Sequence, residues 1–222
     1  MNRIKVLYDA VMAMRKKETF NGTLTVQVNK DDVRLFSLRN EFVKNLLTGQ
    51  TKAKITTDLN YDGTTFNHES NTEFTRQPSG ECRQHHFHNL HPHFQHFHEA
   101  GRHGGWQGRL ARLAFGFSIL SALQIEEQEG KPVIMLSAAD LSEDARDLFR
   151  EHLIRFGACR QHQRHGLFRE ICQADEPDFA ARIFLNANHE IEKAVIIFAG
   201  TRQDEQNTAH DVTAKVELSL VG

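Results

Sequence analysis

Hydrophobic and polar residues change their spacing within the first forty positions of the chain. Apolar residues recur every three or four positions over residues 2–18, which predicts a helix. The spacing then becomes two, since Leu24, Val26 and Val28 alternate with polar neighbours. This alternation is typical of a strand with one buried face. A second strand is expected at 33–38, after a short polar turn.

The pattern continues in the same order as far as residue 75. Apolar residues within 40–48 fit one side of a short helix, which Gly49 would end. Alternating residues over 53–59 predict another strand, and a turn leads from it into a strand at 64–75. The N-terminal part therefore reads as helix, hairpin, short helix and hairpin.

A similar order recurs after residue 105. A helical stripe over 106–120 precedes a predicted hairpin at 122–128 and 132–138. The helix predicted at 142–156 has the clearest signals, with Ser142 as the N-cap and Gly157 at its end. The remaining expected strands cover 167–173, 180–187, 190–200 and 211–221.

These elements predict an α+β fold with mostly antiparallel sheet and helices packed on one face. The repeated order also allows two tandem helix–hairpin–helix–strand units, although no residue-level repeat is visible. The alternative is a single curved antiparallel sheet with an insertion, which would offer a groove to an apolar ligand. The expected divisions are an N-terminal α+β half at 1–78, a His-rich linker at 79–106 and a C-terminal α+β half at 107–222.

Charge and composition narrow the classes of partner. The chain has 222 residues, with 27 Lys and Arg against 29 Asp and Glu, and a formal net charge of -2. This near-balance argues against a nucleic-acid partner, because such proteins usually carry a basic excess. The sequence also shows no apolar stretch as long as a membrane-spanning helix. Three cysteines imply no disulfide framework, so we expect a cytoplasmic location.

One segment departs sharply from average composition. Eight of the 14 histidines fall between Glu81 and Trp106. Six of them form three His-x-His units, each displaced by five residues: His86 and His88, His91 and His93, and His96 and His98. In an extended chain, residues two apart point the same way, so each unit can present two imidazoles to one ion. Imidazole suits zinc, nickel and copper, and His85 and Cys82 would act as auxiliary ligands.

A second organisation of the same segment competes with the first. Phe87, Leu90, Phe94 and Phe97 have the spacing of one helical face, and Pro92 fits the first turn of a short helix. A helix would break the His-x-His pairing. A solvated linker, or a pH-sensing or interaction surface, is the further alternative. The sequence leaves these open.

Other chemical constellations are weaker. Cys159, His162, His165 and Cys172 supply zinc-type ligands, but their spacing is not a usual structural pattern, and a loop with half-buried cysteines is the simpler interpretation. His152 falls on the apolar side of its predicted helix and reads as a core residue. The chain contains no Walker A loop, Rossmann glycine fingerprint, His-Glu-x-x-His or Gly-x-Ser-x-Gly motif.

The sequence therefore predicts a non-enzymatic protein that binds a divalent transition metal, with Zn, Ni or Cu as the candidate ions. The ligand set looks redundant, which favours storage, buffering or delivery over a closed four-ligand site. The expected ligands are His85, His86, His88, His91, His93, His96, His98 and Cys82. The alternative is a ligand-carrying or protein-interaction module on the curved sheet, in which a protein is the further candidate partner.

Overall fold

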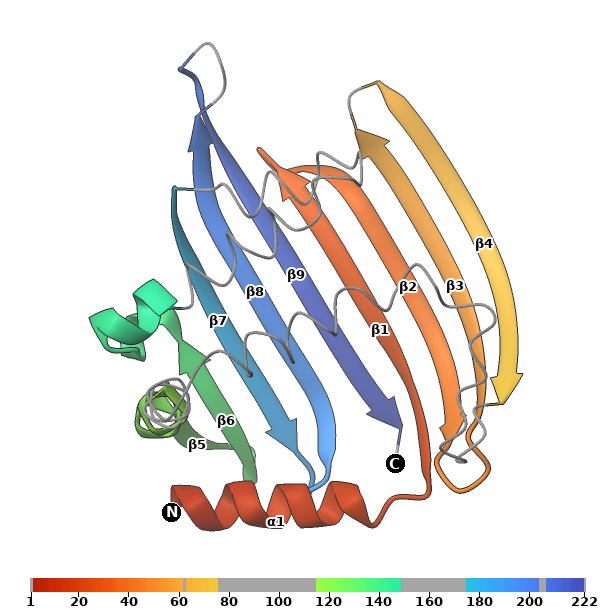
Figure 1. Cartoon of the computed structure of the whole chain (residues 1–222), viewed down its shortest axis with the longest axis vertical. Coiled ribbons are helices and arrows are strands. Elements are labelled where there is room, and N and C mark those ends of the chain that lie inside the picture. The colour runs from red at the N-terminus through yellow and green to blue at the C-terminus, as the bar shows by residue number, and fades with distance from the viewer. Residues whose placement is uncertain (1, 62, 76–114, 149–174, 204–206, 222) are drawn as a thin grey trace, which may run out of the picture.

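The described chain forms one large antiparallel sheet. The computed structural model describes residues 2–61, 63–75, 115–148, 175–203 and 207–221. Nine strands of the described chain lie in the order β4-β3-β2-β1-β9-β8-β7-β6-β5 (Figure 1). Their bounds are β1 Thr19–Lys30, β2 Val33–Asn45, β3 Gln50–Tyr61, β4 Thr64–Thr75, β5 Gln124–Gln128, β6 Lys131–Ser137, β7 Asp175–Leu185, β8 Ile191–Gln203 and β9 Ala209–Val221.

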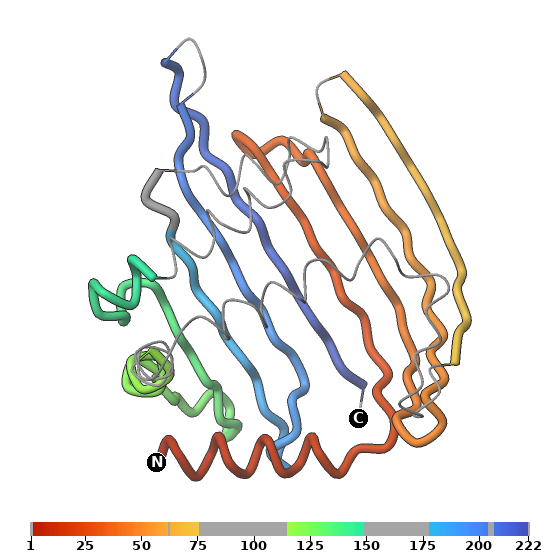
Figure 2. Tube along the Cα trace, viewed as in Figure 1, coloured from red at the N-terminus to blue at the C-terminus, as the bar shows by residue number. Residues whose placement is uncertain are grey.

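The predicted α+β fold with possible tandem units is wrong. Strands from both ends of the chain belong to a single sheet. The described helices are α1 (Arg3–Arg15), the 3-10 turn η1 (Ala138–Asp140), and helical segments at 115–122 and 143–148. Helix α1 runs along one end of the strands of the sheet, and the other described helices lie beside β5 and β6 (Figure 1). The N-terminal strands β1–β4 and the C-terminal strands β5–β9 join where β1 pairs with β9. These two strands run side by side at the centre of the sheet (Figure 2).

The short helix predicted at 40–48 is also wrong, because this stretch belongs largely to β2. Phe42 and Val43 lie on opposite faces of that strand, as their partners Gly22 and Asn21 on β1 show. The strand ends where the side-chain Oδ1 of Asn45 accepts hydrogen bonds from the backbone N–H groups of residues 47 and 48, both at 2.9 Å. This local turn satisfies the backbone without a helix.

Several other predictions lie partly or wholly outside the described residues. The helix predicted at 106–120 is described from residue 115, and the one at 142–156 only over 143–148. The strand predicted at 167–173 lies outside the described residues. The His-rich segment lies outside them as well. The strands predicted at 64–75 and 190–200 correspond to β4 and β8.

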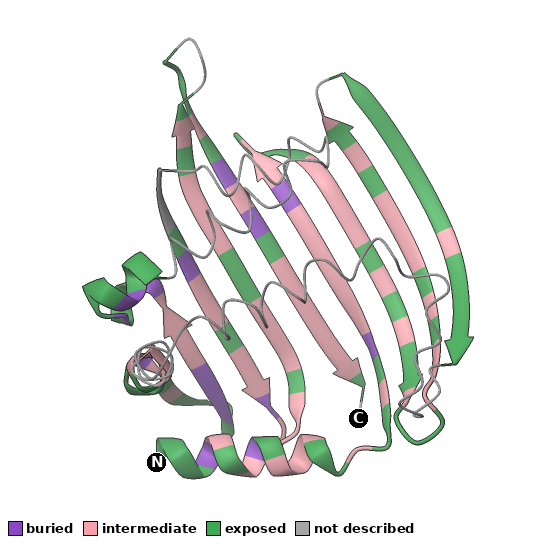
Figure 3. Ribbon diagram, in the orientation of Figure 1, coloured by how far each residue is buried: buried purple, intermediate pink, exposed green. Residues whose placement is uncertain are grey.

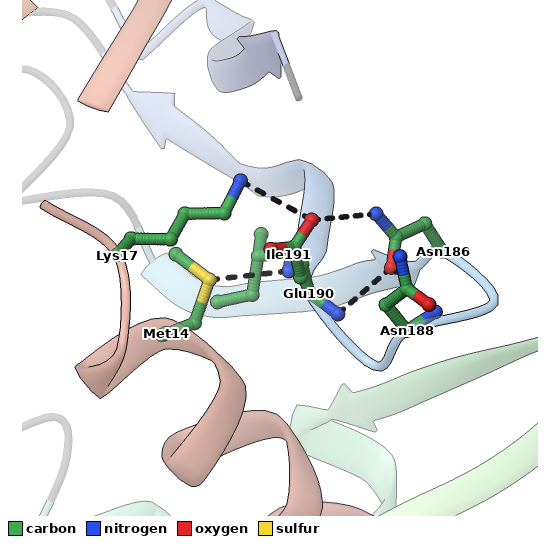
Figure 4. A network of polar contacts seen from close by, with 6 residues as sticks. All are labelled: Met14, Lys17, Asn186, Asn188, Glu190 and Ile191. Carbon is green, nitrogen blue, oxygen red and sulfur yellow. Dashed lines mark hydrogen bonds and ion pairs between the residues drawn. The ribbon is translucent and has the colours of Figure 1, made fainter. Parts of the chain in front are cut away.

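Helix α1 is fastened to the turn between β7 and β8. The carboxylate Oε2 of Glu190 accepts a hydrogen bond from Asn186 Nδ2 at 2.9 Å and lies 3.3 Å from Lys17 Nζ (Figure 4). The backbone N–H of Ile191 donates to Met14 Sδ at 3.3 Å. Hydrogen bonding to Asn186, followed by the Lys17 contacts, lowers the pKa of Glu190. These contacts fix the end of α1 beside the sheet.

The two faces of the sheet differ in composition because the strands alternate in register. Val26 of β1 lies opposite Leu38 of β2 and Val216 of β9, so these three apolar side chains share one face. The residues between them, such as Thr25, Arg39 and Glu217, point to the other face. The face that carries Val26 is called the apolar face below, and its opposite the polar face.

Candidate binding face of the sheet

The apolar face divides into two halves. Over β5–β8, the described helices pack against it and form two buried clusters. One cluster joins Ala122 and Ala145 of the helical segments, and Leu141 just after η1, to Phe179 of β7. The other joins Val6 and Ala10 of α1 to Ile134 and Leu185. We call this part the helix-covered half.

The distal half is the part of the apolar face formed by β9 and β1–β4. No helix in the described ranges packs on it (Figure 1). Val28 of β1 and Ala214 of β9 form a small buried cluster on its central strands. The rest of these strands is largely half-buried and the far edge is exposed (Figure 3), with Phe66 and Phe74 of β4 at 50% and 55% exposure. Its half-buried apolar side chains are Leu24, Val26, Leu38, Phe42, Ile55, Leu59, Val216, Leu218 and Leu220.

Asn40 is a polar residue at the middle of this surface, which also carries Thr57 of β3 and polar residues of β4. It faces Leu24 on β1 and Ile55 on β3 in the register, and Leu38 and Phe42 flank it on the same face of its own strand. Its Oδ1 atom is buried and has no hydrogen-bond partner among the described residues. An unsatisfied buried acceptor of this kind costs about 1–3 kcal/mol, so it needs an explanation in a folded protein.

The polar face carries cross-strand ion pairs instead. Lys54 Nζ lies 2.9 Å from Glu69 Oε1, and Lys52 Nζ lies 3.2 Å from Glu73 Oε1, in both cases between β3 and β4. The Glu69 contact raises the pKa of Lys54, and the Lys52 contact lowers the pKa of Glu73. Exposed pairs of this kind add little stability, and they mark this face as solvated.

A surface cavity of about 520 Å³ near the start of α1 is a weaker candidate. Four of its lining residues pair with one another: Gln124 Nε2 donates to Asp140 Oδ1 at 2.6 Å, and Arg3 Nη1 donates to the Ser121 carbonyl at 3.1 Å. Among the described residues that line it, no buried polar side-chain atom lacks a partner.

The predicted metal ligands are not among the described residues. His85, His86, His88, His91, His93, His96, His98 and Cys82 all lie within 76–114, and His152, Cys159, His162, His165 and Cys172 lie within 149–174. The described histidines are His68, His189 and His210, which lie on separate elements. Within the ranges that the structure covers, no group of three or more His, Cys, Asp or Glu side chains could hold a metal ion.

Sequence reasoning did not single out Asn40. The interpretation of 40–48 as a helix removed it from any strand face. The alternation of Phe36, Leu38 and Phe42 would have placed it at the centre of a buried strand face, where an unpaired amide stands out.

Comparisons with known proteins add no family. No family model matches the chain, and no curated protein matches it. Among solved structures, it is similar to an N-terminal dehydratase from the difficidin assembly line, with 11% identity, 99% of this chain and 84% of that chain covered, and a TM-score of 0.16. It is also similar to a bifunctional dehydratase-cyclase domain in ambruticin biosynthesis, with 12% identity, 99% and 80% coverage, and a TM-score of 0.17. At these TM-scores, neither likeness carries a fold or an activity to this chain.

No helix in the described parts of the chain is long and apolar enough to cross a membrane.

Proposed function

We propose that the protein is a non-catalytic binding protein, and that the distal half of the apolar face holds an apolar ligand with a hydrogen-bond donor, such as a long-chain alcohol or amide. The observation that carries this proposal is the unpartnered Oδ1 of Asn40, which lies among the half-buried apolar side chains of this surface. A hydrocarbon chain would cover the half-buried side chains. Its hydroxyl or amide N–H would donate to Asn40.

The burial of the surface supports an apolar ligand. Leu38 and Ile55 are half-buried, whereas Leu185 in the helix-covered half has no exposed surface. Each additional 100 Å² of apolar surface that a ligand removes from water contributes about 2.5 kcal/mol to binding, before the costs of association are subtracted. The single amide then fixes the orientation of the chain, as a few polar groups do in other apolar sites.

Two neighbouring residues of β3 provide a matched test. Ile55 lies on the apolar face and Thr56 on the polar face, where it pairs with Arg39 of β2 and Glu69 of β4. Ile55→Lys should weaken binding of a fluorescent long-chain alcohol at least tenfold, because it places a charge on the ligand surface (about 1.4 kcal/mol per tenfold). Thr56→Lys, which adds the same charge on the other face, should bind as the wild type does.

The readout is a fluorescence titration, with circular dichroism confirming that both variants fold. Saturable binding by the wild type, lost only in Ile55→Lys, supports the proposal. An absence of binding by the wild type, or an equal loss in both variants, contradicts it.

Metal binding through the His-rich segment is the second candidate function, supported by the three His-x-His units between His86 and His98. Elemental analysis of untagged protein, purified without chelators or metal-affinity steps, tests it beside a deletion of 84–98. Near-integer zinc, nickel or copper in the intact chain and none in the deletion would support a site. Retained stoichiometric metal in the deletion would exclude these ligands.

The cytoplasmic location also stays a prediction from the cysteine count.

A further inference from the structure

The two edges of the sheet are built differently. The β5 edge is a short strand of five residues, and Glu126, Glu127 and Glu129 lie along or just after it. Short, charged edges prevent pairing with other chains. The β4 edge has twelve residues, and among the described strands it pairs only with β3. Every residue of β4 except Ser70 is exposed (Figure 3).

The sequence of β4 is nearly symmetric about Ser70. Residues 65–75 read TFNHESNTEFT, with Phe66 and Phe74 four positions on either side of Ser70 and threonines at both ends. A strand with this symmetry can pair antiparallel with a second copy of itself around a two-fold axis through Ser70.

From this symmetry we propose that the β4 edge pairs with the β4 edge of a second copy, with Ser70 opposite Ser70. In this register Phe66 lies opposite Phe74 of the second copy, and the reciprocal pair forms across the axis. Both phenylalanines are about half exposed in the single chain, at 50% and 55%. Aromatic cross-strand pairs stabilise a sheet, and edge pairing adds backbone hydrogen bonds along the whole strand.

The glutamates of β4 favour this register over those with the two-fold axis at Glu69 or Asn71. With Ser70 on the axis, Glu69 lies opposite Asn71 of the other copy and Glu73 opposite Asn67. A shift of the axis to Glu69 places two glutamates opposite each other, and a shift to Asn71 opposes Glu69 and Glu73. Like charges directly opposite destabilise a sheet. The Ser70 register alone combines the Phe–Phe pairs with unopposed glutamates.

The pairing also keeps the two apolar faces on the same side. Residues of equal parity pair in this register, so Phe66 of one copy and Phe74 of the other share the face that carries Leu38 and Ile55. The dimer would therefore place the apolar faces of both copies on the same side of the joined sheet.

Disulfide trapping tests the register. In a full-length background with Cys82, Cys159 and Cys172 changed to serine, Ser70→Cys should form a covalent dimer under mild oxidation, since directly opposite residues of a sheet lie within disulfide range. Asn71→Cys is the matched control, because its two copies would lie two residues apart along the strands and out of range. Equal trapping at both positions, or none at position 70, overturns the proposal.

Two substitutions of Asn71 with opposite charges test the same contact between copies without cysteine. Asn71→Glu should weaken dimerisation roughly tenfold in analytical ultracentrifugation, because the new carboxylate faces Glu69 of the second copy twice in each dimer. Within its own chain that carboxylate faces Lys54, which favours folding. Asn71→Lys reverses both effects and should keep or tighten the dimer. A wild type that stays monomeric at all concentrations, or equal behaviour of both variants, overturns the proposal and leaves the edge to another chain or to solvent.

Discussion

The helix-covered half and the distal half of the apolar face use the same strand alternation but reach different burial. In the first, α1 and the helical segments complete a closed core around Leu185 and Ile134. In the second, a buried cluster is limited to Val28 and Ala214, while the described chain leaves Leu38 and Ile55 half-buried and the Oδ1 of Asn40 without a partner. Closed packing serves stability, whereas a half-buried apolar surface with one unsatisfied acceptor is suited to a ligand.

The largest expected difference between the halves concerns stability. Leu185→Ala should lower the free energy of unfolding by about 2–5 kcal/mol, because the side chain is fully buried and its removal leaves a cavity. Leu38→Ala in the distal half should cost only about 1 kcal/mol, since part of its surface is already in water. Urea denaturation measures both, and equal losses would contradict the division into two halves.

The contact between β1 and β9, within the distal half, is expected to resist added volume. Gly22 of β1 is buried beside β9, and a Cβ built on it would lie 2.9 Å from Leu220 Cδ2 and closer still to the Ser219 carbonyl oxygen. Gly22→Ala should therefore destabilise the protein by about 1–3 kcal/mol by forcing β1 and β9 apart. Thr23→Ala, on the next residue and the opposite face, serves as the control in thermal unfolding. A variant as stable as the wild type would show that the strands can move without cost.

Replacement of Asn40 should affect the stability of the protein and its affinity for a ligand in different ways. Asn40→Leu should keep or raise the free energy of unfolding by about 1 kcal/mol, because it deletes an unsatisfied buried acceptor. Its affinity for a long-chain alcohol should fall about tenfold, while its affinity for the matching hydrocarbon stays unchanged (about 1.4 kcal/mol per tenfold). Calorimetry with both ligands measures this, and equal changes for the two would remove Asn40 from the site.

The smallest expected effect comes from the polar face, which spans both halves. The pKa of Glu217 is lowered by Lys193 and Lys215, and that of Glu73 by Lys52 and Gln50. A lowered folded pKa stabilises the protein above the unfolded value and ceases to do so as pH falls through the folded value. Stability should therefore decline modestly below about pH 4.3, and less so in Lys52→Met. Chemical denaturation at several pH values checks this, and identical pH profiles for the two proteins would contradict it.

The local strand pattern could be predicted from the sequence, but the sheet that joins the strands could not. Alternation at Leu24, Val26 and Val28 identified β1 because one face of that strand is apolar and the other polar. The pairing of β1 with β9 joins residues that are far apart in the chain, such as Val28 and Ala214. The local spacing of apolar residues does not predict such a pairing. The local pattern therefore allows both two tandem units and a single sheet, and the structure has one sheet.

The error over 40–48 has a specific cause. Val43 and Leu46 have helical spacing, yet Val43 points to the polar face of β2 and Leu46 lies in the turn that follows, where its N–H donates to the Glu18 carbonyl at 2.7 Å. This hydrogen bond between distant parts of the chain outweighed the local preference of residues 40–48 for a helix. Asn40 was missed with the strand that positions it. The predicted metal ligands lie outside the described residues, so their role stays a prediction.

The binding of a ligand to the distal half is tested most directly by methyl NMR with a spin-labelled long-chain alcohol. Val43 and Ile197 provide the internal control, because they lie on the polar face and are more than 40% exposed, at 43% and 42%. If the ligand lies on the distal half, the methyl signals of Leu38 and Ile55 will broaden saturably while those of Val43 and Ile197 will not. Preferential broadening of Val43 and Ile197, or none at Leu38 and Ile55, would contradict binding at the distal half.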